Sequence, residues 1–240
     1  MIQIFTVKRL KRNWYKNRAY NIQSMELLSA RIDMEGLVAF GFYICRAAEY
    51  HPLSNQNPNK MISASDCLCD HEPQIFLCHG WKPRGDDENY ISRFRSKDEY
   101  LKMSEEINGL YNSGLFFEDG RFARIEDALY FFNTYFRDQD LILISVSSRL
   151  DYLKTYEDIK YYGNDYIDGF DAIGMDILGW DNCSFHSFLC NSLQDEFPDI
   201  RFNKYGFIET DYETAALIAS KIQGKGEPVD WFPVAVYRIR

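Results

Sequence analysis

The order of apolar and polar residues along the chain predicts several strands. Residues 2–7 (Ile-Gln-Ile-Phe-Thr-Val) alternate as a half-buried strand does, and residues 141–146 form a continuous apolar run typical of a strand buried on both faces. Residues 37–45 form a second buried run. Further strands are expected at residues 74–78, 205–208 and 229–239.

Helical spacing occurs between these strands. In residues 124–137, four large apolar side chains recur at i, i+4, i+7 and i+11 and share one helix face: Ile125, Leu129, Phe132 and Phe136. Other helices are expected at residues 25–32, 90–107 (ended by Asn108-Gly109), 184–197 and 213–222. This order of elements indicates an α+β or an irregular α/β fold. We expect α+β, with a mixed sheet, packed helices and an irregular topology.

Composition places the chain among ordinary globular proteins. Its 240 residues are 46% hydrophobic and include 18 Phe, 17 Tyr and 4 Trp. Aromatic side chains in this number exclude a disordered chain, because they provide a large buried surface. We expect a single α+β domain over residues 1–240, with a candidate subdomain boundary in the turn-rich stretch near 109–120.

Three features of the sequence bear on where the protein is located. The longest apolar run, residues 37–45, has nine residues, whereas a membrane helix needs about 18 to 20. Six Lys and Arg residues crowd the first twenty positions with no apolar core after them, which argues against a secretory signal. Six cysteines are too few for a disulfide scaffold and are expected to be reduced thiols. We therefore expect a cytoplasmic protein.

Negative charge is concentrated in the second half of the chain. The net charge is −9; residues 1–120 hold 15 basic and 16 acidic side chains, and residues 121–240 hold 12 and 20. Residues 161–200 contain eight acidic residues and no Lys or Arg. Such a segment either faces water or docks a basic partner, since opposed potentials accelerate and orient association.

The densest group of metal-ligand residue types is the run Cys67-Leu-Cys69-Asp-His71 with Cys78 and His79 after it. Four of these side chains could hold a structural zinc ion, and the candidates are Cys67, Cys69, His71 and Cys78. The alternative is buried thiols with surface histidines, because Cys-x-Cys-x-His is tighter than the usual ligand spacing. We expect no other cofactor.

Two further patterns are compatible with catalysis but incomplete. On the helix expected at 184–197, His186 and Cys190 lie at i and i+4, with Cys183 one turn earlier, so a thiol and a base could meet. The alternative is packed cysteines and a hydrogen-bonded histidine. Asp165, Asp168 and Asp171 lack the spacing of a calcium loop, although two of them could act as acid and base.

The basic cluster at residues 8–12, with aromatic residues up to position 20, resembles a nucleic-acid contact in character. The sequence pI near 5.0 disfavours phosphate binding, and a solvated basic strand end is the alternative. No dinucleotide-binding glycine motif, Walker loop, nucleophile elbow or His-Glu-x-x-His motif occurs in the sequence. The sequence does not decide whether the chain is an enzyme, although the lack of these motifs favours a protein that is not one.

Gly169, Gly174 and Gly179 each precede a large apolar residue and an Asp, in three consecutive pentads. A five-residue period fits neither a helix face nor one side of a strand. The glycines therefore mark places where the backbone approaches another group closely, unless the repeat is accidental.

Taken together, a compact, acidic, aromatic-rich chain without a catalytic motif resembles the bacterial immunity proteins that neutralise polymorphic toxins. Residues 179–191 (Gly-Trp-Asp-Asn-Cys-Ser-Phe-His-Ser-Phe-Leu-Cys-Asn) are similar to stretches in uncharacterised bacterial proteins. The resemblance implies a protein that inhibits a basic partner, such as a nuclease-like toxin.

The acidic, aromatic-rich stretch at 161–200 supplies the expected partner-binding residues, which are Asp165, Tyr166, Asp168, Asp171, Asp176, Trp180 and Asp181. The alternative function is a metal-assisted hydrolase that uses the Asp cluster or the Cys and His groups. A third is nucleic-acid binding through residues 8–20.

Overall fold

A computed structural model describes residues 36–46, 94–156, 159, 170–181, 185–188, 193, 196–203 and 205–240. All of them belong to the unit Ile32–Arg240, the larger of the two compact units into which the chain divides. The strands expected at 2–7 and 74–78 and the helix expected at 25–32 lie outside the described residues.

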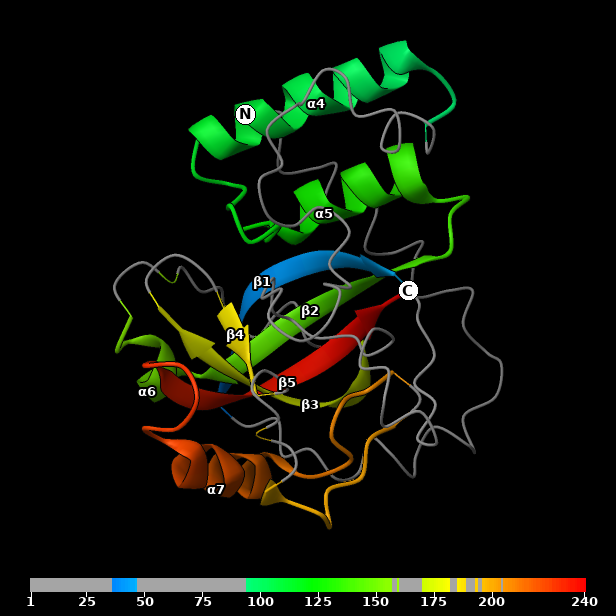
Figure 1. The fold of residues 1–240 in the computed structure, drawn as a ribbon. Helices are drawn as coiled ribbons and strands as arrows, with labels where there is room; N and C mark the ends of the chain where they lie inside the picture. Colours follow the sequence, from blue (N-terminus) through cyan, green and yellow to red (C-terminus); the bar gives the residue numbers. More distant parts are fainter. Residues whose placement is uncertain are drawn as a thin grey trace. The chain divides into compact units, whose positions relative to one another are not determined.

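Five strands form one sheet in the order β1-β2-β5-β3-β4 (Figure 1). Their bounds are β1 Leu37–Arg46, β2 Leu141–Arg149, β3 Asp171–Trp180, β4 Phe185–Ser187 and β5 Asp230–Ile239. With its helices, this sheet confirms the α+β fold. Every described strand pair is antiparallel, where we expected a mixed sheet. A hydrophobic pattern shows which residues are buried but does not encode the direction of a strand.

One face of the sheet is concave and carries its own hydrophobic core. This core takes alternate residues from all five strands, as the two-residue period of a strand requires, and includes Phe40, Ile144, Leu178, Phe185 and Phe232. The rings of Phe40 and Phe185 lie 5.8 Å apart although β1 and β4 are the opposite ends of the strand order. The sheet therefore curls until its two ends meet.

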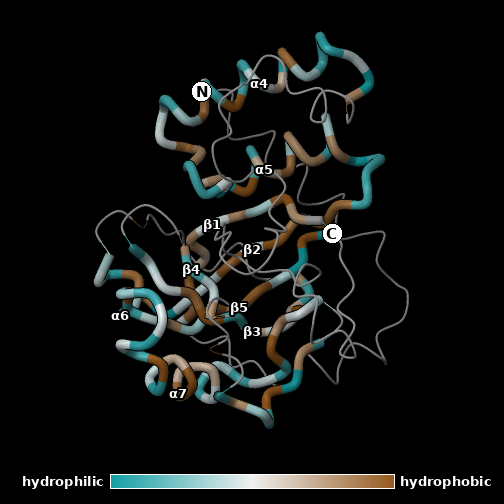
Figure 2. Tube along the Cα trace, viewed as in Figure 1, coloured by the Kyte–Doolittle hydropathy of each residue, from teal (hydrophilic) through white to brown (hydrophobic). Residues whose placement is uncertain are grey.

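The other face is covered by helices. Helix α4 (Lys97–Asn112), helix α5 (Ile125–Phe131) and its π-helical continuation η3 (Phe132–Phe136) pack on residues of β1 and β2, whereas α7 (Tyr212–Ile222) packs on β3 and β5 (Figure 1). A single turn, α6 (Leu150–Leu153), follows β2. Figure 2 shows hydrophobic positions along the central strands. Among the described residues, no helix is both long and apolar enough to cross a bilayer.

The elements with the clearest apolar patterns are confirmed. The run at 141–146 lies in β2, the segment at 229–239 in β5, and the helix at 213–222 is α7. The helix at 124–137 is present as α5 and η3. At 205–208, however, the chain turns, and only Ile208 makes bridges, to Met175 and to Phe202.

Two helix predictions need correction. Residues 185–187 form strand β4, not a helix, because they pair with the end of β3, with Trp180 opposite Phe185. Within the helix expected at 90–107, residues 90–93 lie outside the described residues, and α4 starts at Lys97, where the Ser96 hydroxyl accepts a 3.1 Å hydrogen bond from the Glu99 amide. It then runs through Gly109 to Asn112, so Asn108-Gly109 does not end it.

The expectation of close approach at the pentad glycines is confirmed at two positions. Gly174 lies at a bulge in β3 with φ +146°, and a Cβ there would be 2.6 Å from the Cβ of Phe207. A Cβ on Gly179 would be 2.1 Å from a methyl carbon of Val229. Gly169 lies outside the described residues.

Candidate functional site

Four of the seven expected partner-binding residues are described, and all four lie on or directly after β3: Asp171, Asp176, Trp180 and Asp181. Asp165, Tyr166 and Asp168 lie outside the described residues, as do the zinc candidates Cys67, Cys69, His71 and Cys78. Within the described ranges, no group of three or more His, Cys, Asp or Glu side chains is placed to hold a metal ion.

The β3 residues do not form an exposed row. Asp176 is 3% exposed and Trp180 is 8% exposed, because strand alternation directs both side chains to the concave face. The Asp176 carboxylate accepts a 2.8 Å hydrogen bond from the Ile177 amide. In this conformation neither side chain is available to a partner, which corrects our expectation at these two positions. Asp171 is partly exposed and forms an ion pair with Arg240.

Asp181 and His186 form a pair that the sequence did not predict. The Nε2 atom of His186 lies 2.9 Å from a carboxylate oxygen of Asp181, and both side chains remain partly accessible. Because β4 is a strand, His186 lies opposite Gly179, whereas the helix expected here would have set it beside Cys183 and Cys190. Those two cysteines lie outside the described residues. Acid–base sites use a carboxylate to orient an imidazole in this way, and the same pair also occurs as a structural contact.

A second unpredicted cluster is a buried ion pair between Asp119 and Arg121, each about 1% exposed. The Nε atom of Arg121 lies 3.2 Å from the Asp119 carboxylate, which also accepts a 3.1 Å hydrogen bond from the Tyr43 hydroxyl. The guanidinium donates to the carbonyl of Phe40 at 3.2 Å and lies 5.5 Å from the ring centre of Phe185. Arg121 therefore contacts both β1 and β4, where the two ends of the sheet meet.

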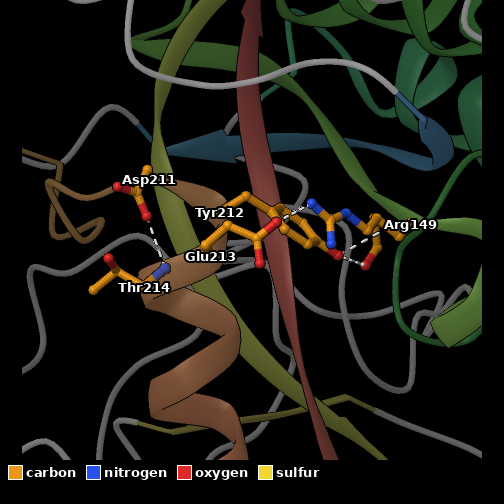
Figure 3. A network of polar contacts seen from close by, with 6 residues as sticks. Arg149, Asp211, Tyr212, Glu213 and Thr214 are labelled. Carbon is orange, nitrogen blue, oxygen red and sulfur yellow. Dashed lines mark hydrogen bonds and ion pairs between the residues drawn. The ribbon is translucent and has the colours of Figure 1, made fainter.

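A third polar network attaches α7 to β2 (Figure 3). The Tyr212 hydroxyl accepts a 3.0 Å hydrogen bond from the Arg149 amide and lies 2.8 Å from the Ser148 hydroxyl. Ser148 in turn lies 2.7 Å from the Pro233 carbonyl, to which it donates. The Ser148 hydroxyl has only one proton, which it donates to the Pro233 carbonyl. The Tyr212 hydroxyl is therefore the donor in its hydrogen bond with Ser148. Burial raises the pKa of Tyr212 to about 12, and we assign this network to stability.

Exposed apolar side chains gather on the helices that cover β1 and β2. Four large apolar residues of the described chain are 40% to 54% exposed, and three of them, Leu101, Tyr111 and Tyr130, belong to α4 and α5. The fourth, Leu217, lies on α7. Of these, Tyr130 is the one that bonds to a carboxylate across the two helices, and we use the name α4–α5 surface for the side chains of Glu106, Tyr130 and Tyr135.

The carboxylate of Glu106 is the polar centre of the α4–α5 surface. One oxygen accepts a 2.9 Å hydrogen bond from the Tyr135 hydroxyl, and the other accepts a 3.3 Å hydrogen bond from Tyr130. The two rings are perpendicular, with centres 6.4 Å apart. Burial and then the bond to Glu106 raise the pKa of Tyr135 above its usual range. Lys102, one helical turn before Glu106, lies 3.9 Å from the carboxylate.

The π-helical turn explains why two tyrosines reach one carboxylate. In an α-helix, residues five apart are separated by about 140° around the axis. In η3 the hydrogen bonds run from i to i+5, so the turn is wider and residues five apart face similar directions. Tyr130 and Tyr135 can therefore both bond to Glu106. The sequence contained no signal for this, because the apolar stripe of residues 124–137 fits an ordinary α-helix.

Comparisons with protein-family models, with curated proteins and with solved structures gave no match to this chain. Functional arguments therefore rest on the residues described above, and the α4–α5 surface is the best candidate site among them.

Proposed function

We propose that this chain is a cytoplasmic binding protein that inhibits a basic partner enzyme, and that the α4–α5 surface contacts the partner. The observation that carries the proposal is that Tyr130, one of the four most exposed large apolar side chains of the described residues, bonds to a partly exposed carboxylate, Glu106, that Tyr135 also holds. Protein interfaces combine aromatic side chains at their centre with charge that complements the partner.

The charge of the chain supports a basic partner. A net charge of −9 attracts a positively charged protein and repels nucleic acid. The resemblance to bacterial immunity proteins favours a nuclease-like toxin as the partner. Asp165, Tyr166 and Asp168, which lie outside the described residues, stay in the proposal as a second contact region. Partly exposed Asp171 begins β3, and partly exposed Asp181 follows it directly.

The experiment is capture of the partner from native cell extract at low and at high salt, followed by an enzymatic assay of what is captured. We expect a basic protein that is retained at low salt, released at high salt and inhibited by the chain. The variant Tyr130→Ser should bind it at least about tenfold more weakly, since central aromatic contacts dominate interface energy.

The matched control is Leu217→Ser, which removes a large exposed apolar side chain from α7. Equal weakening by both variants would show that surface hydrophobicity in general, and not the α4–α5 surface, retains the partner. A captured protein whose activity the chain does not change would overturn the inhibitory function.

A second candidate is the metal-assisted hydrolase, which the Asp181–His186 pair favours. An oriented imidazole can act as a general base or bind a metal ion, and zinc at Cys67, Cys69, His71 and Cys78 belongs to this candidate. Stoichiometric metal in protein purified without added ions, with hydrolysis that His186→Gln abolishes, would support it. Protein free of metal and inactive toward ester and phosphoester substrates would count against it.

A further inference from the structure

Resting on the proposed function, we infer that Glu106 is the point at which the α4–α5 surface binds an arginine side chain of the basic partner. Glu106 is partly buried between α4 and the α5–η3 helix, with less than a third of its side chain exposed. The two tyrosyl hydroxyls fix its carboxylate in one orientation before any partner arrives. Such preorganisation reduces the entropy lost on binding.

The carboxylate has acceptor capacity left for a guanidinium. An ionised carboxylate offers about four acceptor positions, two on each oxygen. Tyr130 occupies one position on one oxygen and Tyr135 one on the other. Counting the described residues, one position therefore remains on each oxygen, and two parallel N–H groups of a guanidinium fill that pattern.

Lys102 already holds a positive charge near this position, but loosely. Its ammonium nitrogen lies 3.9 Å from the carboxylate, beyond hydrogen-bond distance, and its side chain is 65% exposed. Exposed ion pairs of this kind contribute little. Lys102 therefore neutralises Glu106 in the free protein and leaves its place when the partner's cation binds. Removing Lys102 should strengthen binding.

Arginine suits this site better than lysine does. Its planar guanidinium can bond both carboxylate oxygens at once and can stack on an aromatic face, whereas an ammonium acts as a point charge. Tyr130 is 45% exposed and its hydroxyl bonds to the same carboxylate, so its ring lies beside the binding position.

The test is titration of the full chain with Nα-acetyl-arginine amide, followed through the NMR signals of carbon-13-labelled tyrosine rings. The Tyr130 and Tyr135 signals, assigned with Tyr130→Phe and Tyr135→Phe, should shift and saturate. We expect Lys102→Met to bind the probe about two- to fivefold more tightly than the wild type. Glu106→Gln, which keeps the shape of the side chain, should lose saturable binding.

The control is Lys97→Met, which changes the net charge equally and lies in the first turn of α4. Its binding should stay within about twofold of the wild type, since distant exposed charges are screened. Saturable binding to Glu106→Gln, equal effects of Lys97→Met and Lys102→Met, or equal binding of Nα-acetyl-lysine amide would each overturn the inference. The titration uses no partner protein. An intact arginine site with no captured partner would therefore refute the proposed function alone, and a captured partner without the arginine site would refute this inference alone.

Discussion

At the scale of single residues, three neighbouring buried serines of β2 differ in what their hydroxyls do. Ser148 bonds to the Pro233 carbonyl and to Tyr212. The pairing of β2 with β5 stops at Ser147 opposite Ala235, and Pro233 beyond it has no amide proton to donate to β2. The Ser148 hydroxyl therefore donates to the Pro233 carbonyl in place of a backbone amide. Ser145 and Ser147 are equally buried, but their hydroxyls have no hydrogen-bond partner among the described groups.

We predict that Ser148→Ala lowers the free energy of unfolding by about 1 to 3 kcal/mol, because it leaves buried polar groups of Tyr212 and Pro233 unsatisfied. Urea denaturation followed by circular dichroism measures this. Ser147→Ala is the matched control and should be neutral or stabilising, since it removes a buried hydroxyl without a partner. A similar loss in both variants would show that packing, and not hydrogen bonding, decides stability here.

At the scale of elements, the sequence predicted those whose apolar pattern is long enough to decide the type. The apolar runs of β2 and β5 and the apolar spacing of α7 are sufficient to predict the type of each element, because the spacing follows from which side chains are buried. The helix prediction is wrong at residues 185–187, where Phe185, Phe188 and Leu189 have helical spacing. Pairing with β3 outweighs that local preference at residues 185–187.

The buried Arg121 could not be predicted, because its place depends on a distant element. Asp119-Gly-Arg121 has the composition of an exposed turn. It is buried because Gly41, in a bulge of β1, leaves room for the Arg121 side chain: a Cβ there would lie 2.3 Å from its Cδ. Nothing in the local sequence reports such a contact across 80 positions.

We predict that Arg121→Met destabilises the protein by about 3 to 5 kcal/mol, because it leaves the Asp119 carboxylate buried without a cation. Hydrogen exchange should accelerate in β1 and in β4 together, since Arg121 contacts both. Two controls separate charge from packing. Arg124→Met removes an exposed ion pair with Asp127 and should cost at most about 1 kcal/mol. Asp119→Leu/Arg121→Met should recover much of the loss. Faster exchange confined to residues 115–123 would contradict a link between the two strands.

At the scale of the whole molecule, the order of the elements predicted the class of fold, and the charge led to the expectation of a basic partner, but neither indicated the candidate surface. Both helices of the α4–α5 surface were expected, yet the meeting of Glu106 with Tyr130 and Tyr135 depends on packing between helices and on a π-helical turn. Acidic residues on β3 were the stronger sequence signal. Two expected contacts there, Asp176 and Trp180, are buried instead, because counting charges does not show which strand face they occupy.

The tyrosine content of the chain also sets an alkaline limit on its stability. Burial raises the pKa of five described tyrosines: Tyr135, Tyr152, Tyr156, Tyr212 and Tyr237. In the unfolded chain a tyrosine loses its proton near pH 10, whereas the folded protein keeps that of Tyr212 until about pH 12. Below pH 10 both states are protonated and stability is unaffected. Between pH 10 and pH 12 the unfolded state binds fewer protons, so the free energy of unfolding falls as pH rises.

We predict a free energy of unfolding in urea that is nearly constant from pH 8 to about pH 10 and then declines, with Tyr212 alone contributing about 2 kcal/mol by pH 12. Tyr212→Phe should be less stable at pH 8, because it loses the proton donated to Ser148, and should decline less steeply above pH 10. An unchanged slope in Tyr212→Phe would mean that the other buried tyrosines carry the alkaline loss.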